Sequence, residues 1–283
     1  MQTSGSMEAI VAAADLRRAV DEFVAVYARR PIPQNLGGMR FNHSFATWFI
    51  LQALKPGTVI ESGVWQGHST WLIEQACPGA KVYCLDLTFS QLIYRSPTAT
   101  YIQRDFSECG WQDVDRASTL CFFDDHQNAY ARLKELRWAG FTRAIFEDNF
   151  PCGEGDCYTL RHMLSGFGHE HLQMSQGYQG DAQAQQQRQF LEKVLRSFGA
   201  RQQMLVRANT VDRDLFAHNC KEYYEFPPVA LAATSSWGPA YTGAYEAKPP
   251  LYTAADLPPD LRALMQRDPA EFGYSYLAYV ELT

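Results

Sequence analysis

Residues 58–70 read TVIESGVWQGHST, and this stretch decides the fold. A short apolar strand ends at Glu61, and Gly63 and Gly67 then enclose a tight turn. The apolar spacing over residues 68–76 predicts a helix directly after the turn. A strand, a glycine turn and a helix in this order are typical of α/β proteins that bind a ligand at the carboxyl end of the strand.

Apolar runs typical of strands recur along the chain and alternate with helical segments, such as the one predicted over 130–139. The five runs that we interpret as strands are 58–61, 81–86, 100–103, 119–123 and 143–146. Such alternation implies right-handed crossovers between parallel strands. We therefore expect an α/β fold with a mostly parallel sheet, helices on both faces, and a final antiparallel strand over 274–282.

The remaining segments suggest how the chain is organised. Apolar residues at three- and four-residue steps predict one helix over 7–29, and a second helix is expected over 44–54. We divide the chain into an N-terminal helical extension, 1–43, and a main domain, 44–283. The first helix either covers the ligand cleft or forms a contact between copies of the chain.

The main domain carries a C-terminal insertion over 208–270, which is rich in Pro, Ala, Tyr and Ser and has little periodicity. Further helices are predicted over 154–166 and 184–198, and a sixth strand over 202–206. The polar stretch between the two helices, 166–187, is either a lid or a surface loop.

Composition excludes several classes of protein. The chain has 283 residues, of which 46% are hydrophobic, and this is enough for a sizeable core. The net charge of -6 disfavours binding to nucleic acid. No apolar run approaches the ~20 residues that span a bilayer, so we expect no membrane insertion. Seven irregularly spaced cysteines favour a reducing compartment, and the chain is predicted to be cytoplasmic.

Acidic residues stand at or just beyond the carboxyl end of each of the first five predicted strands. They are Glu61, Asp86, Asp105, Asp124 and Glu147. In parallel sheets ligands bind at this edge, so the pattern is the most informative one in the sequence. An acid after the second strand, at Asp86, can accept hydrogen bonds from both hydroxyls of a ribose.

The start of the helix after the glycine turn offers a second recognition feature. Ser69 and Thr70 suit its first turn, and the free amides there can bind a carboxylate or a phosphate. The spacing of Gly63 and Gly67 differs from Gly-x-Gly-x-x-Gly, which makes a pyrophosphate cradle less suitable. The alternative is that both are simple turn glycines and that Glu61 is a capping acid.

The stretch from Glu61 to Gly67, with Asp86, resembles the S-adenosylmethionine (SAM)-dependent methyltransferases over roughly residues 44–210. The resemblance implies a Rossmann-like methyltransferase fold. It also implies that Glu61 and Gly63 face the methionine part of the cofactor, that Asp86 binds the ribose and that Asp105 contacts the adenine. The full set of candidate cofactor-binding residues is Glu61, Gly63, Gly67, Ser69, Asp86 and Asp105.

Two pairs of acids follow the fourth and fifth strands, Asp124-Asp125 and Glu147-Asp148. If those strands are neighbours, their ends lie ~5 Å apart, and four carboxylates there would repel one another. A divalent cation offsets this repulsion. Oxygen ligands with an amide alongside, from Asn149, favour Mg²⁺ or Ca²⁺ over zinc. The alternative is that each acid caps the helix that follows it.

These acids resemble the metal-dependent O-methyltransferases. The catechol type has an acid after strand four and Asp-Asn after strand five. The nearer likeness is to the cephalosporin-biosynthesis and macrolide-sugar group, in which a Glu-Asp pair follows strand five. The resemblance implies that Asp124, Glu147 and Asp148 bind Mg²⁺ or another divalent cation. It leaves open whether Asp124 or Asp125 is the first ligand.

His126 is our candidate catalytic base. The ordinary pKa of histidine is near 6.5, and adjacent carboxylates raise it, which suits removal of a proton from a hydroxyl. The related families place a lysine or histidine one position later, at Gln127 in this chain. His126 therefore has two alternative roles: capping the next helix, or supporting a carboxylate.

Other side chains have less specific interpretations. His43 precedes a predicted helix and could reach the cofactor cleft from the N-terminal side. Tyr223 and Tyr224, with Trp237 and Tyr241, either wall a substrate pocket or fill the core.

Together these observations predict a SAM-dependent O-methyltransferase of enzyme class 2.1.1. It would transfer the methyl group to a metal-held hydroxyl of a small molecule, such as a sugar, a polyketide or a similar natural product. One alternative is a metal-dependent hydrolase or hydroxylase that uses the acids without SAM. The other is a non-catalytic small-molecule-binding protein on the same fold. The sequence leaves open whether the chain forms a homo-oligomer.

Overall fold

The computed structural model describes residues 5–150, 157–166, 210–232, 234–235, 238–239, 248–273 and 276–283. The chain forms two compact units, which are described separately. Unit 1 comprises Met1–Asp125, Leu133–Asn149 and Cys220–Thr283, and unit 2 comprises His126–Arg132 and Phe150–Asn219. The helix predicted over 184–198, the strand predicted over 202–206 and most of the stretch 166–187 lie outside the described residues.

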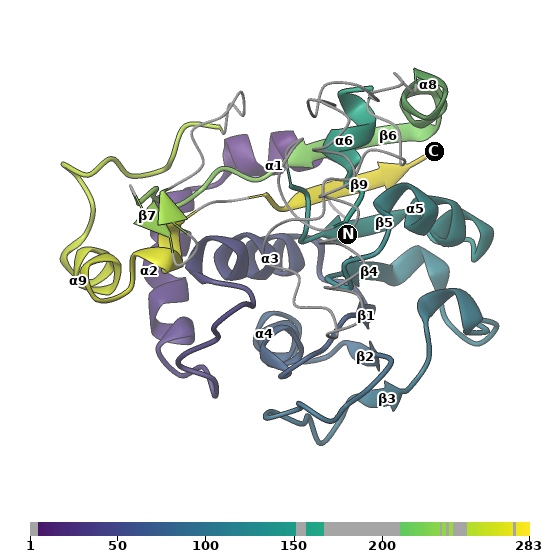
Figure 1. The fold of residues 1–283 in the computed structure, drawn as a ribbon, viewed down its shortest axis with the longest axis horizontal. Coiled ribbons are helices and arrows are strands. Elements are labelled where there is room, and N and C mark those ends of the chain that lie inside the picture. Colours follow the sequence, from purple (N-terminus) through teal and green to yellow (C-terminus); the bar gives the residue numbers. More distant parts are fainter. Residues whose placement is uncertain are drawn as a thin grey trace, which may run out of the picture. The chain divides into compact units, whose positions relative to one another are not determined.

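Unit 1 is built on a seven-stranded sheet with the order β3-β2-β1-β4-β5-β9-β6 (Figure 1). Strands β1 to β5 pair in parallel, whereas β9 runs antiparallel to both of its neighbours, β5 and β6. The strands are β1 (Thr58–Ser62), β2 (Lys81–Leu85), β3 (Thr100–Ile102), β4 (Thr119–Phe123), β5 (Arg143–Phe146), β6 (Cys220–Glu225) and β9 (Ala278–Leu282). The mostly parallel sheet and the antiparallel final strand are thus confirmed.

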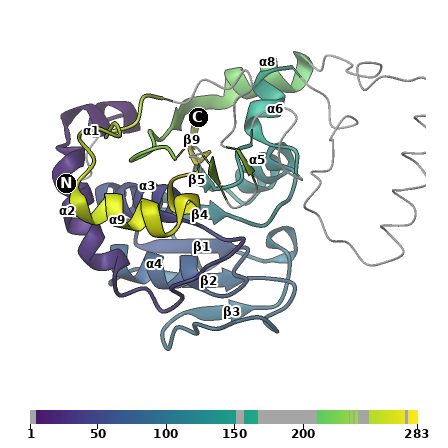
Figure 2. The same ribbon diagram turned by 60° about the vertical axis from the view of Figure 1, so that its left-hand side comes forward.

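Helices cover both faces of this sheet, as predicted. In Figure 1, α3 (Phe41–Leu54) and α4 (His68–Ala76) lie on one side of the strands, and α5 (Ala129–Trp138) lies on the other. In the turned view of Figure 2, β1, β2 and β3 follow one another down the sheet. Every residue of β1 and β4 is buried, which is typical of central strands covered on both faces.

The other elements of unit 1 surround this layer. They are the helices α1 (Met7–Ala13), α2 (Leu16–Tyr27) and α9 (Pro259–Arg267), the 3₁₀ turns η1 (Phe106–Glu108), η2 (Arg116–Ser118) and η4 (Pro269–Phe272), and the small ladder of β7 (Thr234–Ser235) and β8 (Gly238–Pro239). Unit 2 contains α6 (Leu160–Leu164) and α8 (Thr210–Asn219). None of the helices that the structure describes is both long and apolar enough to cross a bilayer.

The N-terminal helices differ from the prediction in two respects. The single helix expected over 7–29 is wrong, because the chain breaks between α1 and α2, where the Asp15 side chain accepts a hydrogen bond from the Arg18 amide. This side-chain cap starts a new helix, which a count of apolar residues does not detect. The helix expected from residue 44 begins earlier, at Phe41, so the proposed boundary between 43 and 44 falls inside α3.

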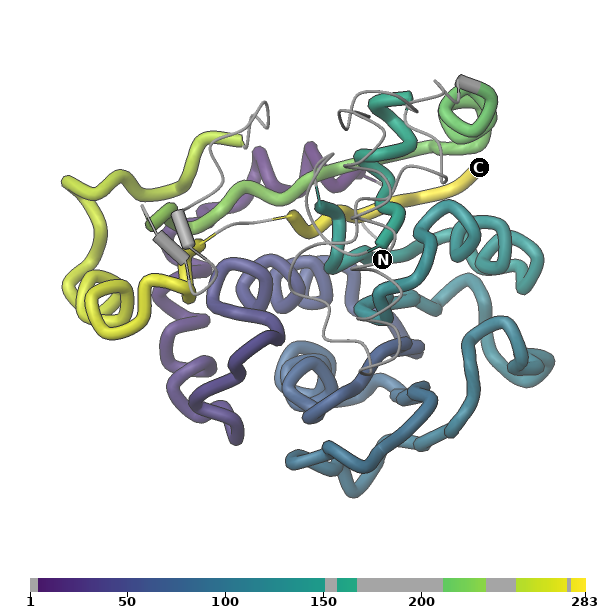
Figure 3. Tube along the Cα trace, viewed as in Figure 1, coloured from purple at the N-terminus to yellow at the C-terminus, as the bar shows by residue number. Residues whose placement is uncertain are grey.

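The N-terminal helices pack against the C-terminal part of the chain within unit 1 (Figure 3). Phe23, Tyr27 and Phe41 form an aromatic cluster with ring centroids 5.1 to 5.5 Å apart. Phe41 also contacts Phe272 of η4 at 5.2 Å. The buried amide of Asn42 binds the backbone of residues 229–230. The extension and the sheet therefore share one core.

The insertion predicted over 208–270 differs from the structure in one respect. Residues 220–225, which the sequence analysis assigned to an insertion, form β6 at the edge of the main sheet. Consecutive polar residues, Lys221-Glu222, conceal this strand, in which only Tyr224 is buried. The final strand is present but shorter than predicted, at 278–282.

Candidate functional site

The register of the parallel strands aligns their carboxyl ends. The last paired residues are Leu85 in β2, Ser62 in β1, Phe123 in β4 and Phe146 in β5. The residues that follow them are, in spatial order, Asp86, Gly63, Asp124 and Glu147. We refer to this row as the rim. Three of the acids that the sequence analysis expected at one edge, Asp86, Asp124 and Glu147, thus follow aligned strand ends.

Two glycines make the turn above β1 possible. Gly63 has φ +91°, and a Cβ there would lie 1.9 Å from the carbonyl oxygen of Asp124. Gly67 has φ +90°, and a Cβ there would lie 2.2 Å from the carbonyl oxygen of Tyr94. In the sequence analysis, the resemblance implied that Gly63 faces the methionine part of the cofactor. The neighbouring backbone already requires glycine at both positions, because a side chain would clash with it.

Asp86 closes this turn from the adjacent strand. Its Oδ2 accepts hydrogen bonds of 3.0 Å from the amides of Val64 and Trp65, and its Oδ1 accepts one from the amide of Thr88. The carboxylate is partly exposed at the rim. Leu87, the next residue, is 67% exposed and offers an apolar surface beside it.

Glu61 lies beneath the turn and is fully buried. The Thr70 hydroxyl in the first turn of α4 donates a 2.6 Å hydrogen bond to its Oε2. Burial raises the pKa of Glu61 to about 7, although hydrogen bonds from Ser69, Thr70 and Cys84 oppose the shift. Among the described residues its Oε1 has no hydrogen-bond partner. Glu61 thus supports the start of α4, with Ser69 also buried there.

Asp105 lies beyond β3, outside the row itself. Its side chain caps the turn η1 by accepting a 2.9 Å hydrogen bond from the Ser107 amide. The carboxylate is half-buried. Its local role is therefore that of a capping acid, and contact with an adenine stays a prediction.

Asp124 and Asp148 are the acids that the fold brings together. Each offers a carboxylate oxygen, and these oxygens lie within 4.8 Å of one another. Asp125 is engaged elsewhere, because the Ser62 hydroxyl donates a 2.6 Å hydrogen bond to its Oδ2. The choice between Asp124 and Asp125 that the sequence left open thus has a geometric basis in favour of Asp124.

Glu147 does not belong to that close pair. It is 6% exposed, and its Oε1 accepts a hydrogen bond from Nδ1 of His43, in the first turn of α3. The amide of Tyr276 donates a 3.0 Å hydrogen bond to the other ring nitrogen of His43. This link joins residues 104 positions apart, and no local pattern in the sequence could have indicated it.

Asn149, two residues after Glu147, is fully buried. Its Nδ2 donates a 2.8 Å hydrogen bond to the hydroxyl of Tyr223 in β6, and that hydroxyl donates to Glu225. Tyr223 therefore has a polar role at the sheet edge, whereas Tyr224 packs in the core against Phe226. Trp237 and Tyr241 lie outside the described residues.

His126 belongs to unit 2. It is exposed and has a left-handed backbone with φ 52°. The capping of α5 is performed by Asn128, whose Oδ1 accepts a 3.0 Å hydrogen bond from the Ala131 amide. The roles considered for His126, as a base, as a cap or as support for a carboxylate, stay predictions.

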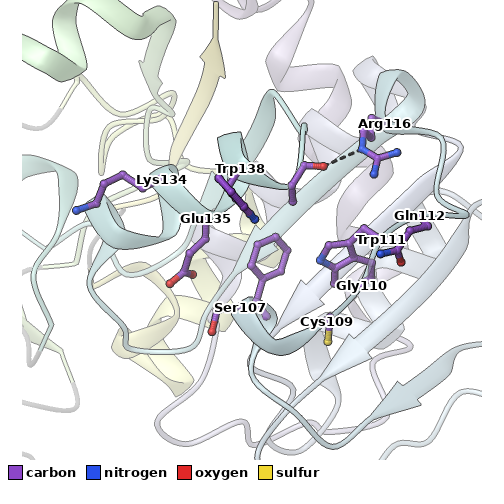
Figure 4. A pocket seen from close by; sticks show the side chains of 11 residues that line it. Ser107, Cys109, Gly110, Trp111, Gln112, Arg116, Lys134, Glu135 and Trp138 are labelled. Carbon is purple, nitrogen blue, oxygen red and sulfur yellow. Dashed lines mark hydrogen bonds between the residues drawn. The ribbon is translucent and has the colours of Figure 1, made fainter.

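A surface hollow of about 470 Å³ is lined by residues other than those of the rim (Figure 4). It is lined by the segment after β3 and by the C-terminal half of α5, including Trp111 and Trp138. Arg116 at its margin donates a hydrogen bond to the Ala139 carbonyl, drawn dashed in Figure 4. It contains none of the predicted site residues.

The rim residues fit the two groups that the sequence predicts. The buried Oε1 of Glu61 is an acceptor that a cationic donor such as an ammonium would satisfy. Asp86 presents a carboxylate beside the amides of the turn. The carboxylates of Asp124 and Asp148, at adjoining strand ends, are ligands of the kind that suits Mg²⁺.

The fold and rim thus define an α/β protein whose mostly parallel sheet has acidic residues at its carboxyl edge. No protein-family model matches the chain, and no curated protein matches it significantly. Among solved structures, it is similar to CmcI with Mg and SAM at 23% identity, over 36% of this chain and 50% of CmcI, with a TM-score of 0.30.

Two further solved structures are similar. One is the MycE methyltransferase from the mycinamycin biosynthetic pathway with Mg and SAH, at 14% identity, over 85% of this chain and 48% of MycE, with a TM-score of 0.34. The other is an O-methyltransferase from Bacillus cereus with SAH, at 15% identity, over 46% of this chain and 65% of that one, with a TM-score of 0.32. The chain spans about half the length of CmcI and MycE.

Proposed function

We propose that this chain is a SAM-dependent, Mg²⁺-assisted O-methyltransferase that acts on a small-molecule hydroxyl. The rim supports the proposal, because residues that follow four neighbouring strands form one row. Asp86 stands at one end of the row, next to the turn that begins at Gly63. Asp124 stands on the opposite side of Gly63. With strands about 4.8 Å apart, Asp86 and Asp124 are separated by roughly 10 Å.

The cofactor would bind over the glycine turn. Asp86 already holds the amides of Val64 and Trp65, so it orders the turn and has its carboxylate in place for the ribose hydroxyls. Leu87 offers an exposed apolar surface next to it, suitable for a flat base. Glu61 and Ser69 act from below by holding the start of α4, whose free amides suit the methionine carboxylate.

The divalent cation would be held by Asp124 and Asp148, with Glu147 as the third acid. A bound Mg²⁺ supplies Lewis-acid chemistry, which lowers the pKa of a coordinated hydroxyl and orients it. Among the chain's own residues, His126 is our proposed base, and the fixed positions of the two subsites would bring the methyl donor and the hydroxyl into line. A sugar or polyketide acceptor and a cytoplasmic location stay predictions from the sequence, which leaves homo-oligomer formation open.

Replacement of the paired acids tests the cation subsite. Asp148→Asn and Asp124→Asn remove charge from a donor set whose oxygens are close together. We expect each to weaken Mn²⁺ binding by more than about tenfold, the effect typical of groups that support a metal. Isothermal titration of the full chain with Mn²⁺ as the probe measures this loss.

Asp125→Asn is the matched control. It removes an equal charge one residue away, but Asp125 is hydrogen-bonded to Ser62 and lies outside the close pair. Mn²⁺ affinity should stay near that of the unmodified protein. An equal loss in all three variants would indicate general electrostatic attraction and would contradict a defined site.

A further inference from the structure

His43 occupies a buried position between three separate parts of unit 1. It is 3% exposed and lies in the first turn of α3. Its Nδ1 contacts Glu147 after β5, and its Nε2 contacts the backbone of Tyr276 just before β9. The pairing of Phe146 with Ala278 brings these two chain segments side by side.

The hydrogen bonds determine which nitrogen of His43 carries the proton. The amide of Tyr276 can only donate, so Nε2 must accept. In a neutral imidazole the other nitrogen is then the donor, so Nδ1–H donates to Oε1 of Glu147. The Tyr276 amide thus directs the donor side of the ring towards the carboxylate.

This arrangement fixes the orientation of Glu147. Both side chains are buried, and the ring is held from its far side by backbone. A hydrogen bond to Oε1 restricts rotation of the carboxylate about its last torsion angle, and so determines where the second oxygen points. Groups that orient the ligands of a metal typically contribute 10- to 100-fold to its affinity.

We propose that His43 is a positioning residue for the cation subsite, holding Glu147 in the orientation in which it contributes an oxygen. This inference rests on the proposed function, because it requires a cation at Asp124, Glu147 and Asp148. The competing interpretation is that His43 ties α3 to the sheet and affects only stability.

Two amide substitutions separate these interpretations. In His43→Asn, the side-chain amide nitrogen can occupy the place of Nδ1 and donate to Glu147, while the contact with Tyr276 is lost. In His43→Gln, the longer side chain can place its carbonyl oxygen at Nε2 and accept from Tyr276, while the donor to Glu147 is lost. Each variant therefore keeps one of the two contacts and loses the other.

The measurement is Mn²⁺ affinity of the full chain by isothermal titration, with urea unfolding recorded for each variant. We expect His43→Gln to weaken Mn²⁺ binding by about tenfold or more and His43→Asn to stay closer to the unmodified protein. If the unmodified chain binds Mn²⁺ and the Asn variant is as weak as or weaker than the Gln variant, the positioning role is wrong while the cation site stands. If the unmodified chain does not bind Mn²⁺, the proposed cation site itself is wrong.

A double-mutant cycle tests the same inference without relying on one variant's fold. Glu147→Gln removes the group through which His43 is proposed to act. In that background His43→Gln should cause little further loss of Mn²⁺ affinity, because the two residues act as a unit. Additive losses would show that His43 acts independently of Glu147 and would overturn the inference.

Discussion

At the scale of single residues, Gly63 illustrates how the rim is built from close backbone contacts. The turn after β1 passes so near the end of β4 that a Cβ at position 63 would lie 1.9 Å from the Asp124 carbonyl oxygen. The resemblance explained this glycine by the cofactor that it would face, and the structure adds a reason internal to the fold. The two reasons make different predictions for a substitution.

Gly63→Ala should destabilise the protein even without any ligand. An L-residue at φ +91° costs about 1–3 kcal/mol, and the clash adds about 1–3 kcal/mol. We expect the free energy of unfolding to fall by about 2–6 kcal/mol. Urea denaturation measures it. Gly79→Ala is the control, since nothing lies within 4 Å of a Cβ there and its change should stay within about 0.5 kcal/mol. Equal stabilities would contradict the close approach.

Glu61 is a buried acid whose effect on stability depends on pH. Burial raises its pKa from 4.5 to about 7, so the folded chain keeps a proton that the unfolded chain releases between these values. Stability contributed at this position is therefore greatest below about pH 4.5, falls as the pH rises to about 7 and is constant above that.

Glu61→Gln removes this dependence, because glutamine does not titrate. Relative to the unmodified protein, the variant should gain on the order of 3 kcal/mol in unfolding free energy between pH 4.5 and pH 8. The difference between the two urea-unfolding curves, measured across this range, tests the shift. A difference that does not vary with pH would mean that Glu61 titrates normally.

At the scale of elements, two sets of ionic contacts join the N-terminal helices to the C-terminal segment. Arg17 of α2 pairs with Asp256, and their side chains are 54% and 39% exposed. Glu271 of η4 is 2% exposed and accepts hydrogen bonds from the Tyr27 hydroxyl and the Phe41 amide, with Arg30 3.4 Å away. Solvent screens the exposed Arg17–Asp256 pair, whereas it screens the buried contacts of Glu271 much less.

The buried contact should therefore contribute more to the free energy of unfolding than the exposed one. Glu271→Gln leaves the buried Arg30 without its counter-charge, and we expect a loss of about 3–5 kcal/mol in unfolding free energy. Arg17→Ala removes an exposed pair and a cation–π contact and should cost only about 1 kcal/mol. Denaturant titration of both variants checks the order. A larger effect at Arg17 would contradict the shared core.

The elements also show what local patterns predict. The strand positions of β1, β2, β4 and β5 follow from continuous apolar runs, which buried parallel strands require. The break at Asp15 depends on one side-chain cap, and β6 has mixed polarity because it lies at the edge of the sheet. Such features depend on a single hydrogen bond or on a neighbouring strand, so periodicity does not detect them.

At the scale of the whole molecule, topology determined the candidate site. Acids after separate strands were predicted to share an edge, and the register aligns Asp86, Asp124 and Glu147 there. The sequence did not predict which of these acids lie close to one another. Asp125 is held by Ser62 and Glu147 by His43, and both partners are distant in sequence. The spatial neighbours of a carboxylate are set by tertiary packing, whereas its place at the end of a strand is set by local sequence.

The central claim is that one rim accommodates both a sulfonium cofactor and a divalent cation. Isothermal titration of the full chain with S-adenosylhomocysteine, in the presence and absence of Mg²⁺, tests it most directly. We predict saturable binding with one site per chain, together with Mg²⁺ binding that Asp148→Asn weakens. If S-adenosylhomocysteine produces no heat of binding under either condition, the claim that the rim binds this cofactor is contradicted.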